Sequence, residues 1–184
     1  MRLFAALPIP DPARATIVSL LDDLRRSDWP VRWVRQEGIH LTLKFYGEVV
    51  RERLDVIEEA VRFATAGTGP LPLKIGELGA FPTLARPRVL WIALEAPPAL
   101  ELLQDRLERG GVEIGFPPEG APYRPHVTLG RVREGHRLPP GAVERYQAPG
   151  ERLSFLAEEL VLYESVLTSD GPRYEPRLVL PLQR

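Results

Sequence analysis

The feature that most constrains the fold of this chain is a tetrapeptide motif that occurs twice. His40-Leu41-Thr42-Leu43 returns as His126-Val127-Thr128-Leu129, and the two copies use two of the three histidines in the chain. Both copies follow the same order of patterns: a strand, a helix bounded by prolines and a loop. Composition alone makes a chance repeat of this kind rare. The repeat therefore predicts an internal duplication, with two lobes that each bring one motif to a shared surface.

Each motif has the alternation of a β-strand with one polar and one apolar face. Because side chains alternate along a strand with a period of two, His40 and Thr42 point one way while Leu41 and Leu43 point the other. The second motif repeats this arrangement. If the two lobes face each other, two imidazoles and two hydroxyls line one cleft.

Hydrophobic periodicity predicts a mixture of strands and helices. The first expected helix follows Pro10, with Asp11 as its N-cap. The other two run from about 51 to 66, with Phe63 on the apolar side, and from about 98 to 109. Residues 169–172 predict a hairpin turn. The expected strands cover residues 2–7, 31–34, 39–46, 71–81, 88–95, 126–132, 152–156, 160–167 and 177–182.

Length and composition limit the class of protein. With 184 residues, 44% hydrophobic and 27% charged, the chain is expected to form one globular domain, or two small lobes that share a core. No run approaches the ~20 apolar residues of a membrane span, and the amino-terminal segment is too short for a signal peptide, so a cytoplasmic protein is expected. The net charge of -1 excludes a strongly basic protein of the class that coats nucleic acid non-specifically.

The available residue types also restrict the chemistry. Zero cysteines exclude disulfides, thiolate nucleophiles and cysteine zinc sites, and three histidines leave little material for a metal centre. Of the 24 basic residues, 22 are arginines. Arginine is the better bidentate phosphate ligand, although GC-rich coding or adaptation to heat would give the same bias.

Two imidazoles across a cleft suit concerted acid and base catalysis near neutral pH, because histidine has an unperturbed pKa of about 6.5. One imidazole can take a proton from water while the other gives a proton to the leaving oxygen. The hydroxyls of Thr42 and Thr128 can donate hydrogen bonds to phosphate oxygens that gain charge in the transition state. Phosphodiester hydrolysis fits these groups best. Basic residues beside both motifs would attract an anionic substrate: Arg32, Arg35, Lys44, Arg124, Arg131 and Arg133.

The same residues also have interpretations that involve no acid and base catalysis. A histidine beside a threonine in a strand is usually an ordinary polar pair, and His-x-Thr could also supply metal ligands, although two histidines without a further ligand make a thin site. His136 lies in a polar stretch and is expected in a surface loop. Tyr123, Phe45 and Tyr46 could stack on a base, but packing is favoured for them.

At the paired motifs the sequence resembles the 2H phosphoesterase superfamily, and within it the bacterial and archaeal 2′-5′ RNA ligase family, better described as RNA 2′,3′-cyclic phosphodiesterases. The likeness covers nearly the whole chain. Residues 2–7 are similar to the opening strand of the family, and residues 163–174 to its closing hairpin. The two motif blocks are more specific, at residues 33–47 and 123–131.

The resemblance implies an α+β, bilobal duplicated fold, with two antiparallel sheets flanked by helices around a V-shaped central cleft. Residues 1–184 would then form a single bilobal domain. No metal and no nucleotide cofactor are implied, and the absence of a Gly-rich Walker loop agrees with the second point. The implied reaction hydrolyses RNA 2′,3′-cyclic phosphate ends to 2′-phosphate ends, with 2′-5′ ligation as the reverse-type reaction. The expected partner is RNA with such an end, such as tRNA halves, and the chain is expected to be a monomer.

The resemblance also implies roles for individual residues. By analogy with the family, His40 is the general acid for the leaving 3′ oxygen and His126 the general base for water, although the two are symmetric in sequence and a reverse reaction would swap them. Thr42 and Thr128 would bind phosphate oxygens. The family uses an arginine five residues past the second histidine, which is Arg131 here. Strand alternation puts Arg131 on the opposite face from His126 unless the strand twists or bulges near residue 130.

Two other functions are alternatives to the cyclic phosphodiesterase of RNA. The same chemistry could act on a small cyclic phosphate, such as an ADP-ribose or mononucleotide derivative. The second alternative is not an enzyme: it is a non-catalytic RNA-binding module, suggested by the arginines and the candidate stacking aromatics.

Overall fold

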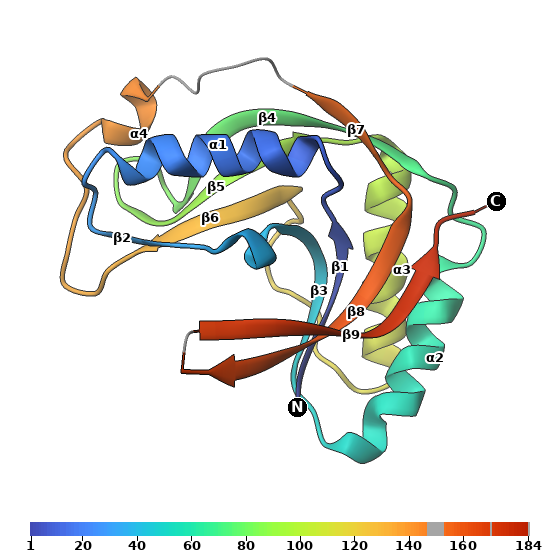
Figure 1. Cartoon of the computed structure of the whole chain (residues 1–184). Helices are drawn as coiled ribbons and strands as arrows, with labels where there is room; N and C mark the ends of the chain where they lie inside the picture. The colour runs from blue at the N-terminus through green and yellow to red at the C-terminus, as the bar shows by residue number, and fades with distance from the viewer. Residues whose placement is uncertain (147–152, 170, 184) are drawn as a thin grey trace.

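A curled antiparallel sheet forms the centre of the molecule (Figure 1). The computed structural model describes residues 1–146, 153–169 and 171–183. Within these residues the sheet has nine strands, in the order β7-β4-β5-β6-β3-β1-β8-β9, with β2 also paired to β6. Their bounds are β1 (Arg2–Pro8), β2 (Val31–Trp33), β3 (His40–Glu48), β4 (Leu71–Pro82), β5 (Pro87–Glu95), β6 (His126–Val132), β7 (Ser154–Ala157), β8 (Glu159–Thr168) and β9 (Gly171–Pro181).

The sheet consists of two similar halves that meet where β3 pairs with β6. One half has the order β3-β1-β8-β9 and the other β6-β5-β4-β7, so matching positions carry the two motif strands. Within the sheet, β3 and β6 form one register pair, Leu41 with Val127. The predicted duplicated α+β fold is confirmed, and the two expected antiparallel sheets are joined into one through this pair.

Helices cover the sheet on the side of the apolar motif residues. α2 and α3 pack on each other, α3 contacts β3, and α2 contacts β8 and β9. Leu41, Leu43, Val127 and Leu129 all belong to the main core, together with buried residues of three helices. The helical elements are α1 (Ala13–Arg25), η1 (Gln36–Gly38), η2 (Arg51–Arg53), α2 (Leu54–Thr65), α3 (Pro98–Glu113) and α4 (Ala142–Arg145). No described helix is long and apolar enough to cross a membrane.

Some local expectations need correction. Asp11 does not cap α1: the helix begins at Ala13, and the Asp11 carboxylate pairs with Arg14 at 3.2 Å. Phe63 was expected on the apolar side of α2 but is 85% exposed, because the buried face passes through Ile57 and Val61 and a residue two positions further on points about 200° away. The short helix α4 was not predicted.

At the carboxy-terminal end the predicted hairpin forms between β8 and β9, where Thr168 pairs with Gly171. Asp170, in the expected turn, lies outside the described residues, as does Arg152 at the start of the expected strand that is observed as β7.

Lys44 does not contribute to the basic surroundings of the first motif, where it was expected. Its side chain is fully buried, and Nζ lies 3.0 Å from Oε2 of Glu108 on α3. A Cβ at Gly111 would lie 2.3 Å from Lys44 Cε, so the glycine provides the room for this side chain. A buried ammonium needs an acidic partner, and here α3 supplies it. The ion pair therefore joins β3 to α3 behind the motif.

Replacing Glu108 with Leu should destabilise the protein by about 3 kcal/mol or more, because Lys44 would stay buried without its partner. The double variant Lys44→Met and Glu108→Leu should recover most of this loss, since two apolar groups need no ion pair. Urea unfolding of the three proteins measures both effects. A single variant that unfolds no earlier than the double variant would show that the pair has no such role.

Candidate active site

The first motif lies among aromatic rings. His40 begins β3, where it pairs with Pro8 of β1, and its ring stacks on Phe4 with centroids 4.9 Å apart. Tyr174 meets the His40 ring edge-on at 5.2 Å, and Tyr163 lies at 6.3 Å. These rings place the imidazole in a largely apolar environment.

Burial lowers the pKa of His40 to about 4. The charged imidazolium loses hydration when apolar rings surround it, so the neutral form is favoured. His40 is therefore uncharged at neutral pH when no substrate is bound.

The second motif has a different environment. His126 begins β6 and contacts Phe81 at 5.1 Å and Trp91 at 5.8 Å. Its Nδ1 lies 2.6 Å from the carbonyl oxygen of Arg124, which accepts a hydrogen bond from Nδ1–H. Burial lowers the pKa of His126, and this hydrogen bond and the charge of Glu119 partly oppose the change. The hydrogen bond fixes the tautomer, so Nε2 of the neutral ring is free to accept a proton.

Gly79 allows Trp91 to reach this position. The two residues are partners in the pairing of β4 with β5, and a Cβ at Gly79 would lie only 2.2 Å from the Trp91 indole. Any larger residue would displace the indole that contacts His126.

The two motifs are related by the antiparallel pairing of β3 with β6. Because Leu41 pairs with Val127, the register places His40 towards Thr128 and Thr42 towards His126. Tyr123, in the loop before β6, donates a hydrogen bond from its hydroxyl to the Thr42 carbonyl at 3.1 Å. The four predicted site residues of the two motifs are thus brought onto one surface.

A β-bulge decides where Arg131 points. Trp91 of β5 pairs with Thr128 and Leu90 pairs with Gly130, so Leu129 is an extra residue on β6. Such a bulge shifts the alternation by one residue. Arg131 therefore lies on the same face as His126, which the predicted phosphate role requires. The first motif has a matching bulge at Leu43.

The charge of Arg131 also acts on the opposite lobe. Burial raises the pKa of Tyr174, and the positive charges of Arg131 and Arg2 oppose that rise. The guanidinium of Arg131 is therefore close enough to the β8–β9 hairpin to act on its tyrosine hydroxyl.

The aromatic residues divide into packed and exposed ones. Tyr46 is buried against Phe116, with ring centroids 5.2 Å apart, and burial raises the pKa of both Tyr46 and Tyr123. Packing is confirmed for these two tyrosines. Phe45 is 52% exposed and lies 5.9 Å from Phe4, so it stays available for stacking. His136 is exposed in a loop, as expected.

The residues that surround the histidines could not be predicted from the sequence. Phe4, Tyr163 and Tyr174 around His40, and Phe81 and Trp91 around His126, come from strands other than the motif strands. Alternation within these strands showed that the side chains share a face with their neighbours, but only the register between strands brings them to a histidine.

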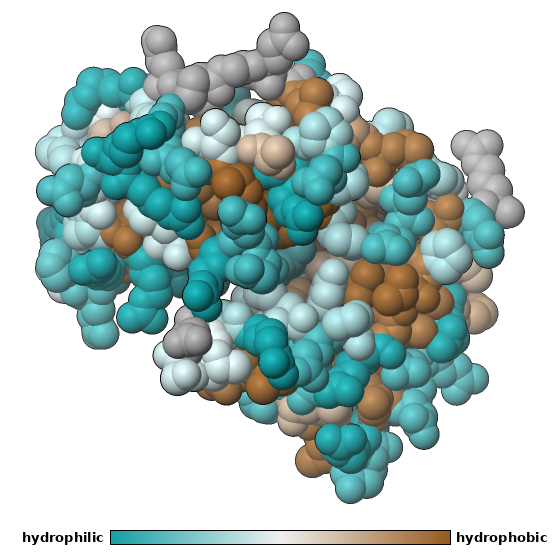
Figure 2. Space-filling model, viewed as in Figure 1, coloured by the Kyte–Doolittle hydropathy of each residue, from teal (hydrophilic) through white to brown (hydrophobic). Residues whose placement is uncertain are grey.

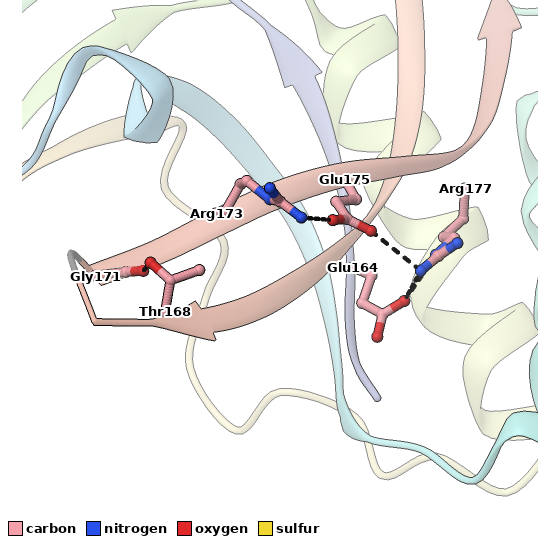
Figure 3. A network of polar contacts seen from close by, with 6 residues as sticks. All are labelled: Glu164, Thr168, Gly171, Arg173, Glu175 and Arg177. Atoms are coloured by element: carbon pink, nitrogen blue, oxygen red, sulfur yellow. Dashed lines mark hydrogen bonds and ion pairs between the residues drawn. The ribbon is translucent and has the colours of Figure 1, made fainter.

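The hairpin that carries Tyr163 and Tyr174 is supported on its other face. Glu164 and Glu175 are register partners there, and both form ion pairs with Arg177. Figure 3 shows this network together with the hydrogen bond from Thr168 Oγ1 to the Gly171 carbonyl, 2.7 Å long, near the turn. Its ion-paired members are Glu164, Arg173, Glu175 and Arg177.

Within the described residues, no three His, Cys, Asp or Glu side chains come together as ligands for a metal ion. The site is built instead from two imidazoles, two threonine hydroxyls and an arginine. This set can transfer protons and bind an anion, which is what phosphoryl chemistry by acid and base catalysis requires.

Comparisons with known proteins agree with this class of site. The chain matches the family described as LigT like Phosphoesterase twice, over residues 7–91 and 92–174. The RNA 2′,3′-cyclic phosphodiesterase of Methanothermobacter thermautotrophicus is 34% identical over 179 residues, which cover 95% of each chain. The chain therefore belongs to the LigT-like phosphoesterase family. The double match also agrees with the duplication in the fold.

Solved structures of similar proteins have the same fold. The protein TT0787 of Thermus thermophilus superimposes with a TM-score of 0.82 at 27% identity, over 99% of this chain and 98% of that one. Escherichia coli LigT complexed with 3′-AMP gives a TM-score of 0.75 at 27% identity, over 100% and 98% of the two chains.

In an NMR pH titration of the protein without substrate, His40 should titrate with a midpoint of about 4. Replacing Tyr174 with Ser removes one of the covering rings and should raise this pKa towards 6.5, because the imidazolium regains hydration. Leu167→Ser, on the same hairpin but 81% exposed, is the control and should leave the midpoint in place. A wild-type midpoint near 6.5 would refute the apolar environment.

Proposed function

We propose that this protein hydrolyses RNA 2′,3′-cyclic phosphate ends to 2′-phosphate ends. The observation that carries the proposal is the convergence of His40, Thr42, His126 and Thr128 on one face, in the register set by the Leu41–Val127 pair. The family membership and the name of the relative from M. thermautotrophicus support the same activity.

In the proposed reaction, His126 is the general base. Its Nε2 takes a proton from water as the water oxygen attacks phosphorus, while Nδ1–H stays bound to the Arg124 carbonyl. The bond from phosphorus to the 3′ oxygen breaks, and His40 gives its proton to that oxygen. The products are a 2′-phosphate and a free 3′-hydroxyl. Because neither ring needs a metal to move its proton, the proposed mechanism is metal-independent.

Thr42, Thr128 and Arg131 bind the phosphate in this proposal. Their hydroxyl and guanidinium groups donate hydrogen bonds to the non-bridging oxygens, which gain charge as water adds. The phosphate charge has a second effect: a nearby anion raises the pKa of His40, which lets this histidine hold the proton that it must donate.

The same groups could also form a 2′-5′ linkage between two RNA ends. If an RNA 5′-hydroxyl replaces water, it gives its proton to His126 as its oxygen attacks the phosphorus, the 3′ oxygen leaves with the proton of His40, and a 2′-5′ linkage forms. The substrate ends could then be tRNA halves. We further propose that residues 1–184 act as one bilobal domain and as a monomer, because both motifs of the site come from the same chain.

The first test incubates the protein, in the presence of EDTA, with a short RNA that ends in a 2′,3′-cyclic phosphate. The expected product is a 2′-phosphate end, and His40→Ala or His126→Ala should each lower turnover by about 10² or more, because each removes a proton-transfer group. His136→Ala is the matched control, since this third histidine lies in an exposed loop. Tight RNA binding without any hydrolysis by wild type would favour a non-catalytic RNA-binding module instead.

The pH dependence of kcat/KM tests the protonation states. This parameter reports the free enzyme, in which both pKa values are lowered, that of His40 to about 4. Activity needs one protonated and one neutral histidine, so kcat/KM should peak below pH 6.5 and fall about tenfold per unit at higher pH. The kcat profile should lie at higher pH, because bound phosphate raises both values. A kcat/KM maximum at pH 8 would contradict these assignments.

A further inference from the structure

Two arginines lie directly opposite each other beside the second motif. Arg32 of β2 is the register partner of Arg131 of β6, and both side chains are exposed. Among the residues that the structure describes, neither guanidinium forms a hydrogen bond or an ion pair with an acidic side chain. Like charges directly opposite on neighbouring strands destabilise a sheet. An anion bound to both guanidinium groups would therefore offset their repulsion.

Arginines elsewhere on the described surface are commonly paired. Arg14 with Asp11, Arg25 with Asp22, Arg62 with Glu58 and Arg109 with Asp105 form ion pairs within or beside single helices. The chain has 25 acidic residues for 24 basic ones, so the composition does not force any arginine to stay unpaired. Within the described residues other arginines, such as Arg51 and Arg137, also form no ion pair, but Arg32 and Arg131 differ from them because the two are register partners on neighbouring strands.

Both arginines project from the face that carries the histidines. On the opposite face of β2, Val31 is buried and Trp33 packs against the core, where a Cβ at Gly130 would meet both side chains. Arg32 lies between these two residues and must therefore point the other way. The bulge at Leu129 places Arg131 on that same face.

The pair also lies beside the proposed position of the cyclic phosphate. Arg131 is three residues beyond Thr128 on one strand, at roughly 3 Å per residue. β2 continues through η1 to β3, which begins at His40, so the strand that carries Arg32 lies next in sequence to the first motif (Figure 1). Figure 2 shows that the side of the molecule formed by β2 and α4 is mainly hydrophilic, whereas apolar surface gathers on the side of β9 and α2.

We propose that Arg32, next to Arg131, binds the phosphodiester that precedes the terminal cyclic phosphate. This inference rests on the proposed function and narrows its substrate class to single-stranded RNA ends of two or more nucleotides. A mononucleotide cyclic phosphate has no phosphodiester at that place. An RNA chain fits the exposed pair because guanidinium groups bind successive backbone phosphates without reading the bases.

The test compares kcat/KM on adenosine 2′,3′-cyclic phosphate with kcat/KM on the dinucleotide ApA that ends in the same cyclic phosphate. Wild type should prefer the dinucleotide by about tenfold or more, as expected for one charged phosphate contact. Arg32→Ala should bring this ratio close to one, mainly through a higher KM for the dinucleotide, and should reduce the salt dependence of binding by about one counterion. Arg32→Lys, which keeps the charge, should retain part of the preference.

Arg51→Ala is the matched control. Arg51 is also exposed, but it lies in η2 at the start of α2, away from β2 and β6 (Figure 1). It should keep the wild-type ratio. If wild type cleaves both substrates equally, or if Arg32→Ala keeps the wild-type ratio or slows both substrates alike, the subsite is refuted while the proposed function stands. If wild type cleaves neither substrate, the proposed function itself fails and the subsite fails with it.

Discussion

The arrangement of the candidate site depends on the pairing of β3 with β6 through Leu41 and Val127. Both residues belong to the main core, and their neighbours along each strand point to the opposite face. Burying the apolar residues of the motifs therefore also sets the positions of the imidazoles and hydroxyls. A shift of one residue in this pairing would turn the polar side chains of one motif into the core. Packing of the core and geometry of the site are thus one constraint.

Near-identical motifs acquire different properties from their surroundings. His40 is enclosed by rings from β1 and the hairpin, whereas His126 is held by the Arg124 carbonyl and contacts two rings of its own lobe. Two residues of one type can thereby hold different proton affinities, which is a common way to divide acid and base roles. The division needs no difference within the motifs themselves, because neighbouring strands supply it.

The sequence was sufficient for the strand and helix order, because alternation and helical spacing are strong in this chain, and for the pairing of the motifs, because the tetrapeptide is repeated. It was not sufficient to predict that the side chain of Lys44 is buried and that of Phe63 is exposed. Lys44 looks like a surface cation until α3 supplies Glu108, and Phe63 looks like core until the buried face of α2 is known. The direction of Arg131 required a bulge that only the pairing with β5 reveals. Tertiary contacts decided each of these cases.

The first strand of the chain has one of its two neighbours almost at the other end of the chain. β1 lies between β3 and β8, and β8 covers Glu159–Thr168. During synthesis β1 is made before the other strands of the sheet, and this edge stays uncovered until β8 has also been made. An uncovered strand edge can pair with other chains, and long-range pairing of this kind is slow. The lobe that contains His40 is thus begun before the other lobe and completed after it, and the edge of β1 stays open to pairing with other chains until then.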